Sequence, residues 1–269
     1  MADTTPARSL LFVPGDRPDR FAKAAAAAPD AVIDGSAIAV AEADKPAARD
    51  HVQRFLDRGS SGIFLLRINA VDTPHLQQDL TLARHPALAG VVLPKAAHGP
   101  MAELVGQLPQ PIWPLVETAR GLADAEKIAA LPQCARMLLG TIDLSLELGL
   151  DMDHPGGRAM LDQARFQLIC AARLAGAAAP LDGVFPALSD DAGLQQAAEH
   201  AAAAGMGGMM CIHPKQLETI HRAFAPTAAQ LDWARAVLAA AKAQPRSFAF
   251  QGEMVDQPVL DRARRMLNL

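Results

Sequence analysis

The sequence predicts an α/β protein, namely one parallel (β/α)₈ TIM barrel followed by a C-terminal helical lid extension. The chain has 269 residues, 51% of them hydrophobic, which suits a single barrel with a large core. Short apolar runs alternate with amphipathic segments along the chain, a pattern typical of βαβ units. Eight such runs occur, and eight parallel strands close into a barrel that has no exposed edge.

The apolar runs are short and are the expected strands. They lie at Ser9–Val13, Ala31–Ile33, Ile63–Ile68, Gly90–Leu93, Ile112–Val116, Arg136–Leu139, Gly183–Phe185 and Gly208–Cys211. Between them, apolar residues recur at helical spacing. Helices are therefore expected at Pro18–Ala28, Asp44–Leu56, Met101–Gln107, Gly121–Ala130, Gly157–Ala175, Asp191–Ala204 and Pro214–Phe224.

The barrel is assigned to residues 1–226, and residues 227–269 form a C-terminal helix and lid segment. This segment should contain helices at Thr227–Lys242 and Pro258–Met266, joined through Gly252–Asp256, which has neither a strand nor a helix pattern. A tail beyond a complete barrel is expected to pack on that barrel or on a neighbouring subunit.

An open doubly wound sheet is the alternative architecture. It is less favoured because the turn after the first strand, Val13–Pro18, is not a dinucleotide-binding fingerprint. The glycines of Gly205–Gly208 enter a strand instead of leaving one, so they predict an ordinary turn and not a phosphate loop.

The composition excludes several classes of partner. A formal net charge of -4 argues against nucleic acid as the main partner, because duplex binding normally needs a basic face. No apolar stretch is long enough to span a bilayer, and the first residues lack the layout of a signal peptide. The three scattered cysteines (Cys134, Cys170 and Cys211) indicate reduced thiols. We therefore expect a cytoplasmic protein.

Four polar residues directly follow apolar runs, so they should ring the mouth at the carboxyl ends of the strands. They are Arg67, Lys95, Glu117 and Asp143. Two carboxylates on neighbouring strand ends repel each other unless a cation or proton neutralises them. Glu117 and Asp143 could therefore hold Mg²⁺, or equally Mn²⁺. The alternatives are a helix N-cap for Asp143 and an ion pair with Arg120 for Glu117.

The other polar candidates have competing interpretations. Arg67 could bind a substrate carboxylate with two hydrogen bonds, or form a structural salt bridge. Lys95 could be a Schiff-base nucleophile, although a charge partner for a carboxylate is favoured. His213 precedes Pro214, which can begin a helix, so a capping or packing role is favoured over catalysis.

Several motifs, in this order and spacing, resemble those of the citrate lyase β-subunit family and its free-standing relatives, within the malyl-CoA lyase and HpcH/HpaI aldolase superfamily. The resemblance covers essentially the whole chain. The motifs that carry it are Arg8–Gly15, Leu66–Asn69, Leu93–Lys95, Val116–Arg120, Gly140–Leu144, Cys211–Pro214 and Gly252–Pro258.

The resemblance implies a TIM barrel that forms a homotrimer or a dimer of trimers. It implies Mg²⁺ held by Glu117 and Asp143, and a substrate oxo-acid whose oxygen or carboxylate Arg67 holds. It also implies that Phe12, Arg17 and Lys23 contact the nucleotide part of CoA. The C-terminal segment would cover an adjacent subunit and bring the carboxylate of Asp256 to manage a proton. The implied reaction is reversible cleavage of a 3-hydroxyacyl thioester into an enolate and a carbonyl compound.

One departure from the family affects the metal site. Its second strand normally ends in an Asp-Leu-Glu-Asp run, which falls here on Gly35–Ile38, and Asp34 is displaced from it by one position. Side chains alternate across a strand, so Asp34 should point to the opposite face. Met209 also replaces a residue that is basic in many relatives, which bears on thioester binding.

Three functional readings follow. The first is a Mg²⁺-dependent lyase that acts on an acyl-CoA. The second is a metal-dependent aldolase acting on an oxo-acid that is not a thioester. The third is a degenerate homologue that binds a ligand or serves as an assembly subunit. Retention of Arg67, Glu117, Asp143 and Asp256 favours an enzyme.

Overall fold

A computed structural model of the chain describes residues 7–34, 40–59, 62–242, 244 and 247–267. The chain divides into two compact units, Met1–Phe224 and Ala225–Leu269. No helix in these described ranges is long and apolar enough to cross a membrane. Each unit is described separately below.

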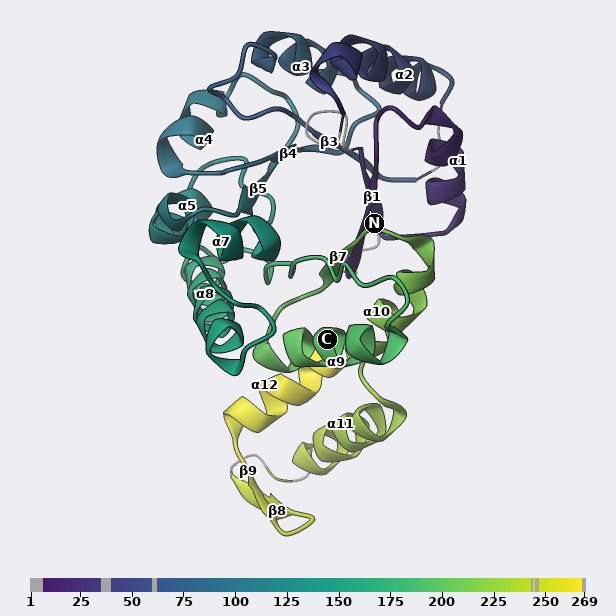
Figure 1. Ribbon diagram of the computed structural model, residues 1–269. Coiled ribbons are helices and arrows are strands. Elements are labelled where there is room, and N and C mark those ends of the chain that lie inside the picture. Colours follow the sequence, from purple (N-terminus) through teal and green to yellow (C-terminus); the bar gives the residue numbers. More distant parts are fainter. Residues whose placement is uncertain (1–6, 35–39, 60–61, 243, 245–246, 268–269) are drawn as a thin grey trace. The chain divides into compact units, whose positions relative to one another are not determined.

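The first unit is built on a curled, fully parallel sheet of seven strands in the order β6-β5-β4-β3-β2-β1-β7 (Figure 1). The strands are β1 (Ser9–Val13), β2 (Ala31–Asp34), β3 (Phe64–Arg67), β4 (Gly90–Leu93), β5 (Ile112–Val116), β6 (Leu138–Leu139) and β7 (Met209–Cys211). The α/β class and the parallel sheet predicted from the sequence are confirmed. Each strand lies within two residues of its expected bounds.

The eighth strand expected at Gly183–Phe185 is not a strand. In its place, single parallel bridges join Leu138 to Leu181 and Asp182 to Met209. Pro180 and Pro186 flank this segment, and proline lacks the N–H that a strand donates. The structure therefore shows a seven-stranded curled sheet, and a regular eight-stranded barrel stays a prediction.

Helices lie on the outer side of the curled sheet (Figure 1). They are α1 (Pro18–Ala26), α2 (Lys45–Asp57), α3 (Leu76–Ala83), α4 (His98–Leu104), α5 (Ala119–Ala123), α6 (Ala125–Ala129), α7 (Thr141–Leu148), α8 (Pro155–Leu174), α9 (Asp191–Ala204) and α10 (Leu217–Ala223), with short 3₁₀ turns at η1 (Glu42–Asp44) and η2 (Pro214–Gln216). The helix expected at Gly121–Ala130 is divided at Asp124 into α5 and α6.

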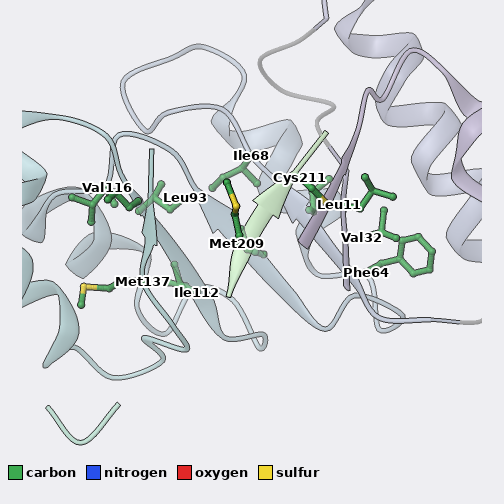
Figure 2. Packing of buried hydrophobic residues seen from close by; sticks show 14 of the residues in the cluster. Leu11, Val32, Phe64, Ile68, Leu93, Ile112, Val116, Met137, Met209 and Cys211 are labelled. Carbon is green, nitrogen blue, oxygen red and sulfur yellow. The ribbon is translucent and has the colours of Figure 1, made fainter. Parts of the chain in front are cut away.

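Side-chain alternation along the strands sorts the core into two clusters. Leu10, Ile33, Leu65 and Val92 belong to an inner cluster that contains no helix residue. The neighbouring strand residues, among them Leu11, Val32 and Phe64, pack with the helices instead (Figure 2). A residue two positions after an inner-cluster residue points to the inside as well, and this rule fixes the orientation of the site residues.

The second unit consists of α11 (Ala228–Ala241), a hairpin of β8 (Phe248–Phe250) and β9 (Glu253–Val255), and α12 (Gln257–Met266). Its small core includes Val237, Phe248 and Val255. The hairpin corrects the expectation that Gly252–Asp256 is irregular. Gln251 and Gly252 both have positive φ, 52° and 86°, which a tight two-residue hairpin turn requires.

Candidate active site

Arg67 is the last residue of β3, and its side chain points to the inside of the curled sheet. It follows Leu65 by two positions and pairs in register with Val92, both of which belong to the inner cluster. The guanidinium carbon lies 5.7 Å from the centre of the Phe12 ring, within range of a cation–π contact. Burial lowers the pKa of Arg67, although the negative charges of Glu117 and Asp143 oppose this shift.

The described residues leave the hydrogen-bonding capacity of Arg67 largely unused. Its Nη2 is 3.6 Å from Oε1 of Glu117, an ion pair but not a hydrogen bond. Its buried Nε has no hydrogen-bond partner among the described residues. A buried donor without a partner costs free energy, so this guanidinium is set to bind an anion that arrives from outside the chain.

Glu117 directly follows β5, and its side chain is buried. Oε1 accepts a hydrogen bond of 2.8 Å from the main-chain N–H of Lys95. Burial raises the pKa of Glu117, and the charge of Asp143 raises it further. The charge of Arg67 and the Lys95 N–H act in the opposite direction. The ion pair of Glu117 is with Arg67, so the alternative partner Arg120, which is exposed, is not used.

Lys95 contributes to the site through its main chain. It has a positive φ of 46°, which is uncommon for a residue with a side chain. Its N–H donates to the carboxylate of Glu117. The side chain is exposed, whereas the Schiff-base alternative depends on burial. Its positive charge also favours the ionised form of Glu117, as expected for a charge partner.

Asp143 is the third residue of α7 and is exposed. It is not the helix N-cap, because Gly140 occupies that position. Its charge acts on both Glu117 and Arg67, so these three residues share one electrostatic environment. In the described part of the chain, no three His, Cys, Asp or Glu side chains are grouped to hold a metal ion by themselves.

Two carboxylates nevertheless fit Mg²⁺. This hard ion usually takes one or two protein carboxylates and completes its octahedron with water and substrate oxygens. Burial raises the pKa of Glu117, and the charge of Asp143 raises it further, so both disfavour the ionised carboxylate. A bound cation would stabilise that ionised form. Glu117 and Asp143 are the carboxylates among the described residues whose charges act together here, so they are the ones that could hold it.

The structure shows where two residues that depart from the family pattern, Asp34 and Met209, lie. Asp34 pairs in register with Val13 and Leu66, which both face the helices, so it points away from the inside of the sheet as the one-residue shift predicts. Met209 is also buried on the helix-facing side (Figure 2). The run Gly35–Ile38 lies outside the described residues.

The residues expected to contact CoA occupy different surroundings. Phe12 is half-buried on the inner side, against Arg67. Arg17, which precedes α1, is exposed and forms an ion pair of 3.0 Å with Asp19. Lys23 is exposed in the last turn of α1. The structure therefore associates Phe12 with the candidate catalytic residues more closely than with the two cationic residues.

His213 has the capping role that the sequence favoured. Its Nδ1 accepts a hydrogen bond from the Lys215 N–H at the start of η2. The hub of this loop is Gln216, which sequence reasoning missed. The oxygen of its buried side-chain amide accepts from the N–H of Ile212, and the amide nitrogen donates to the carbonyl of Phe185. Gln216 therefore joins the loop after β7 to the segment that follows the bridges of Leu181 and Asp182.

Asp256 lies in the second unit, where it is the N-cap of α12 and accepts a hydrogen bond of 3.4 Å from the Val259 N–H. It is half-buried and lines a cavity of about 970 Å³ in that unit, together with the cationic residues Arg235, Lys242 and Arg264. Its predicted role over an adjacent subunit stays a prediction.

The family model for HpcH/HpaI aldolase/citrate lyase matches residues 8–214. The chain belongs to this family. It is 42% identical to a citrate lyase subunit beta-like protein of Mycobacterium tuberculosis, over 96% of this chain and 93% of the relative. It is 34% identical to a (3S)-malyl-CoA thioesterase of Cereibacter sphaeroides, over 87% of this chain and 83% of the relative.

A solved structure of the CitE protein from M. tuberculosis, in complex with magnesium, acetoacetate and coenzyme A, superposes with a TM-score of 0.86. The two chains are 39% identical, and the match covers 98% of each. Membership of the HpcH/HpaI aldolase/citrate lyase family identifies this chain as a lyase-type enzyme, in agreement with the resemblance carried by its motifs.

Proposed function

We propose that this chain is a Mg²⁺-dependent carbon–carbon lyase that cleaves, or forms, a 3-hydroxyacyl-CoA thioester, giving an acyl-CoA enolate and an oxo-acid. The ligands of the similar M. tuberculosis protein, magnesium, acetoacetate and coenzyme A, support this assignment. The observation that carries it is the Arg67–Glu117 pair, in which the buried Nε of Arg67 has no hydrogen-bond partner in the described part of the chain and Glu117 accepts from the Lys95 N–H.

Each residue has a role in this proposal. Glu117 and Asp143 would hold Mg²⁺, which when bound polarises a carbonyl oxygen and stabilises negative charge. The free donors of Arg67 would bind the carboxylate or carbonyl oxygen of the oxo-acid and orient it. Arg17 and Lys23 would bind the phosphates of CoA. Asp256, brought by a second copy in a homotrimer, would move the proton.

The first experiment is a calorimetric titration with Mg²⁺ in the presence of oxaloacetate, pyruvate or glyoxylate. We expect one oxo-acid to bind only when Mg²⁺ is present, and binding of both to be lost in Glu117→Ala and Asp143→Ala. Glu218→Ala, which removes an exposed carboxylate of α10, should bind as the wild type does. Unchanged Mg²⁺ affinity in the two site variants would overturn the metal assignment, and no binding by the wild type would favour a non-catalytic homologue.

A second reaction is suggested by the relative named as a (3S)-malyl-CoA thioesterase. Hydrolysis of the same kind of thioester releases a free thiol, whereas carbon–carbon cleavage leaves the thioester intact and releases an oxo-acid. Assaying both products from malyl-CoA separates the two reactions. Release of thiol without oxo-acid would replace the lyase by a thioesterase.

The CoA site and the homotrimer are tested separately. Capture on immobilised CoA should weaken in the Arg17→Ala/Lys23→Ala variant, and equal capture of the two proteins would exclude these residues as the CoA site. Light scattering should give the mass of three chains. A monomeric mass would remove the proposed role of Asp256 from a second copy.

A further inference from the structure

We propose that Gly140 is a positioning residue for the candidate metal site, because its missing side chain provides the space in which Glu117 stands. The inference rests on the proposed function, in which Glu117 holds a cation. Gly140 follows β6 and precedes α7, so it lies beside Glu117 at the carboxyl ends of neighbouring strands.

A methyl group on Gly140 would have no room. A Cβ built there would lie 2.4 Å from Cβ of Glu117 and 2.9 Å from its Oε2. Both distances are shorter than the contact that two such heavy atoms allow, so one of the groups would have to move.

The backbone on both sides gives little freedom to move. The Gly140 N–H donates a hydrogen bond of 2.9 Å to the carbonyl of Val116, and Val116 pairs in register with Leu139. The Glu117 atom nearest the added methyl is its Cβ, which moves only with the main chain. The opposite carboxylate oxygen, Oε1, is held by the Lys95 N–H. An added methyl must therefore separate β5 from β6 or displace the carboxylate.

Backbone conformation does not explain the glycine. Gly140 has a φ of -87° and a ψ of 80°, near the inverse γ-turn conformation that residues with side chains adopt. Gly149, at the other end of α7, is the opposite case. Its φ is +65°, which favours glycine, but a Cβ there would meet nothing within 4 Å. The helix thus carries one glycine required for space and one required for conformation.

This contrast supplies a matched control. Gly140→Ala should weaken Mg²⁺ binding by about 10–100-fold, the effect typical of removing a group that orients a metal ligand. Gly149→Ala should lower the melting temperature, because alanine resists a positive φ, but leave Mg²⁺ affinity unchanged. Wild-type Mg²⁺ affinity in Gly140→Ala would overturn the proposal. So would an equal loss in Gly149→Ala, since the loss would then reflect general disturbance of α7.

A second measurement needs no metal and so separates this proposal from the proposed function. If the clash is with Glu117, the loss of melting temperature caused by Gly140→Ala should be smaller in a Glu117→Gly background, where the opposing Cβ is absent. This cycle also remains informative if Gly140→Ala alone folds poorly, because the double variant should then recover. An equal loss in both backgrounds would show that Glu117 is not what the glycine accommodates.

Discussion

Two arginines lie at opposite ends of the strands of the first unit, Arg136 buried and Arg67 half-buried, and their hydrogen-bond donors are satisfied in different ways. Arg136, just before β6, donates from Nε to the carbonyl of Ala179 and from Nη1 to the carbonyl of Ala7. Among the described residues, Arg67, at the carboxyl end of β3, has no hydrogen-bond partner for its Nε and forms a loose ion pair of 3.6 Å with Glu117. The same residue type is therefore bound by the chain at one end and left available at the other.

The polar residues near Arg136 are also hydrogen-bonded to one another. Near Arg136, the carboxylate of Asp30 accepts hydrogen bonds from the main chain and hydroxyl of Ser9, and the same hydroxyl contacts His221 at 2.7 Å. Burial lowers the pKa of Arg136 to about 10, while the charge of Asp30 opposes the shift. In parallel α/β folds the amino-terminal face serves stability and the carboxyl-terminal face serves chemistry. In this structure the two ends of the sheet therefore differ in how many of their arginine donors have hydrogen-bond partners.

The largest expected effect is on the free energy of unfolding and concerns Arg136, at the amino-terminal end of the strands. Arg136→Ala removes a buried side chain and leaves the carbonyls of Ala7 and Ala179 without their donor, so we expect the free energy of unfolding to fall by about 3 kcal/mol. Denaturant titration measures this change. Affinity for Mg²⁺ and oxo-acid should be unchanged in the folded fraction. The surface variant Arg235→Ala is the control and should change stability by less than about 0.5 kcal/mol.

Arg67→Met is the reciprocal experiment at the carboxyl end of the strands, where the guanidinium is available to a ligand. Stability should change by less than about 1 kcal/mol, because the Lys95 N–H still binds Glu117 and this carboxyl group can take up a proton. Oxo-acid affinity should fall by about 10–100-fold, since charge-assisted hydrogen bonds contribute about 1.5–3 kcal/mol. The comparison between the ends fails if Arg67→Met unfolds the protein as readily as Arg136→Ala does.

The sequence predicted the sheet because its strands are short apolar runs, and that pattern depends on burial alone. It did not include α3, although Leu76, Leu80 and Ala83 recur at helical spacing, because a helix of only eight residues gives a short pattern. It also missed the hairpin of β8 and β9, because its turn relies on a positive φ at Gln251, which a sequence does not reveal. The segment Gly183–Phe185 was predicted as a strand from composition, although the flanking prolines prevent regular pairing.

For the candidate site, the sequence placed Arg67 and Glu117 together, because both follow apolar strands and parallel strands end at one edge. It could not find the main-chain contribution of Lys95, since any residue supplies an N–H and only the fold directs it. The space at Gly140 was equally hidden, because a glycine kept for space resembles one kept for conformation until its φ is known. The orientation of Asp34 followed from alternation alone.

Behind Arg67, the carboxyl end of β3 is supported by buried hydrogen bonds between Asn69 and Asp79. Asn69, two residues after Arg67, donates its main-chain N–H and its amide to Oδ2 of Asp79 at 2.7 Å and 2.6 Å, and its amide oxygen accepts from Lys45 at 2.8 Å. Oδ1 of Asp79 accepts from Arg49 at 3.1 Å. Both central residues are buried. The chain thus fixes the turn that follows Arg67 and leaves the guanidinium itself available.

Exchanging the two residues tests this support. Asn69→Asp places two buried carboxylates together, so we expect it to cost about 2 kcal/mol of stability, and Asp79→Asn should cost a similar amount. The double variant Asn69→Asp/Asp79→Asn restores one donor and one acceptor between the two side chains, but the new amide nitrogen then opposes the main-chain N–H of residue 69 or Arg49, so we expect only part of the stability and of the oxo-acid affinity to return. Denaturant and calorimetric titrations measure both. A double variant no more stable than either single one would mean that the two residues are not coupled.

The smallest effect concerns the dependence of stability on pH. Burial raises the folded-state pKa of Glu117 above its ordinary value of 4.5, so the folded protein holds this proton more tightly than the unfolded chain does. Between the two values the folded state binds more protons, and the metal-free protein must therefore lose stability as pH rises through this window. The slope is at most about 1.4 kcal/mol per pH unit. Glu117→Gln should remove this decline, whereas Glu218→Gln, at an exposed carboxylate, should keep it. Melting temperatures from pH 4.5 upward provide the measurement, and a decline that persists unchanged in Glu117→Gln would assign it to another buried acid such as Asp182, whose pKa burial also raises.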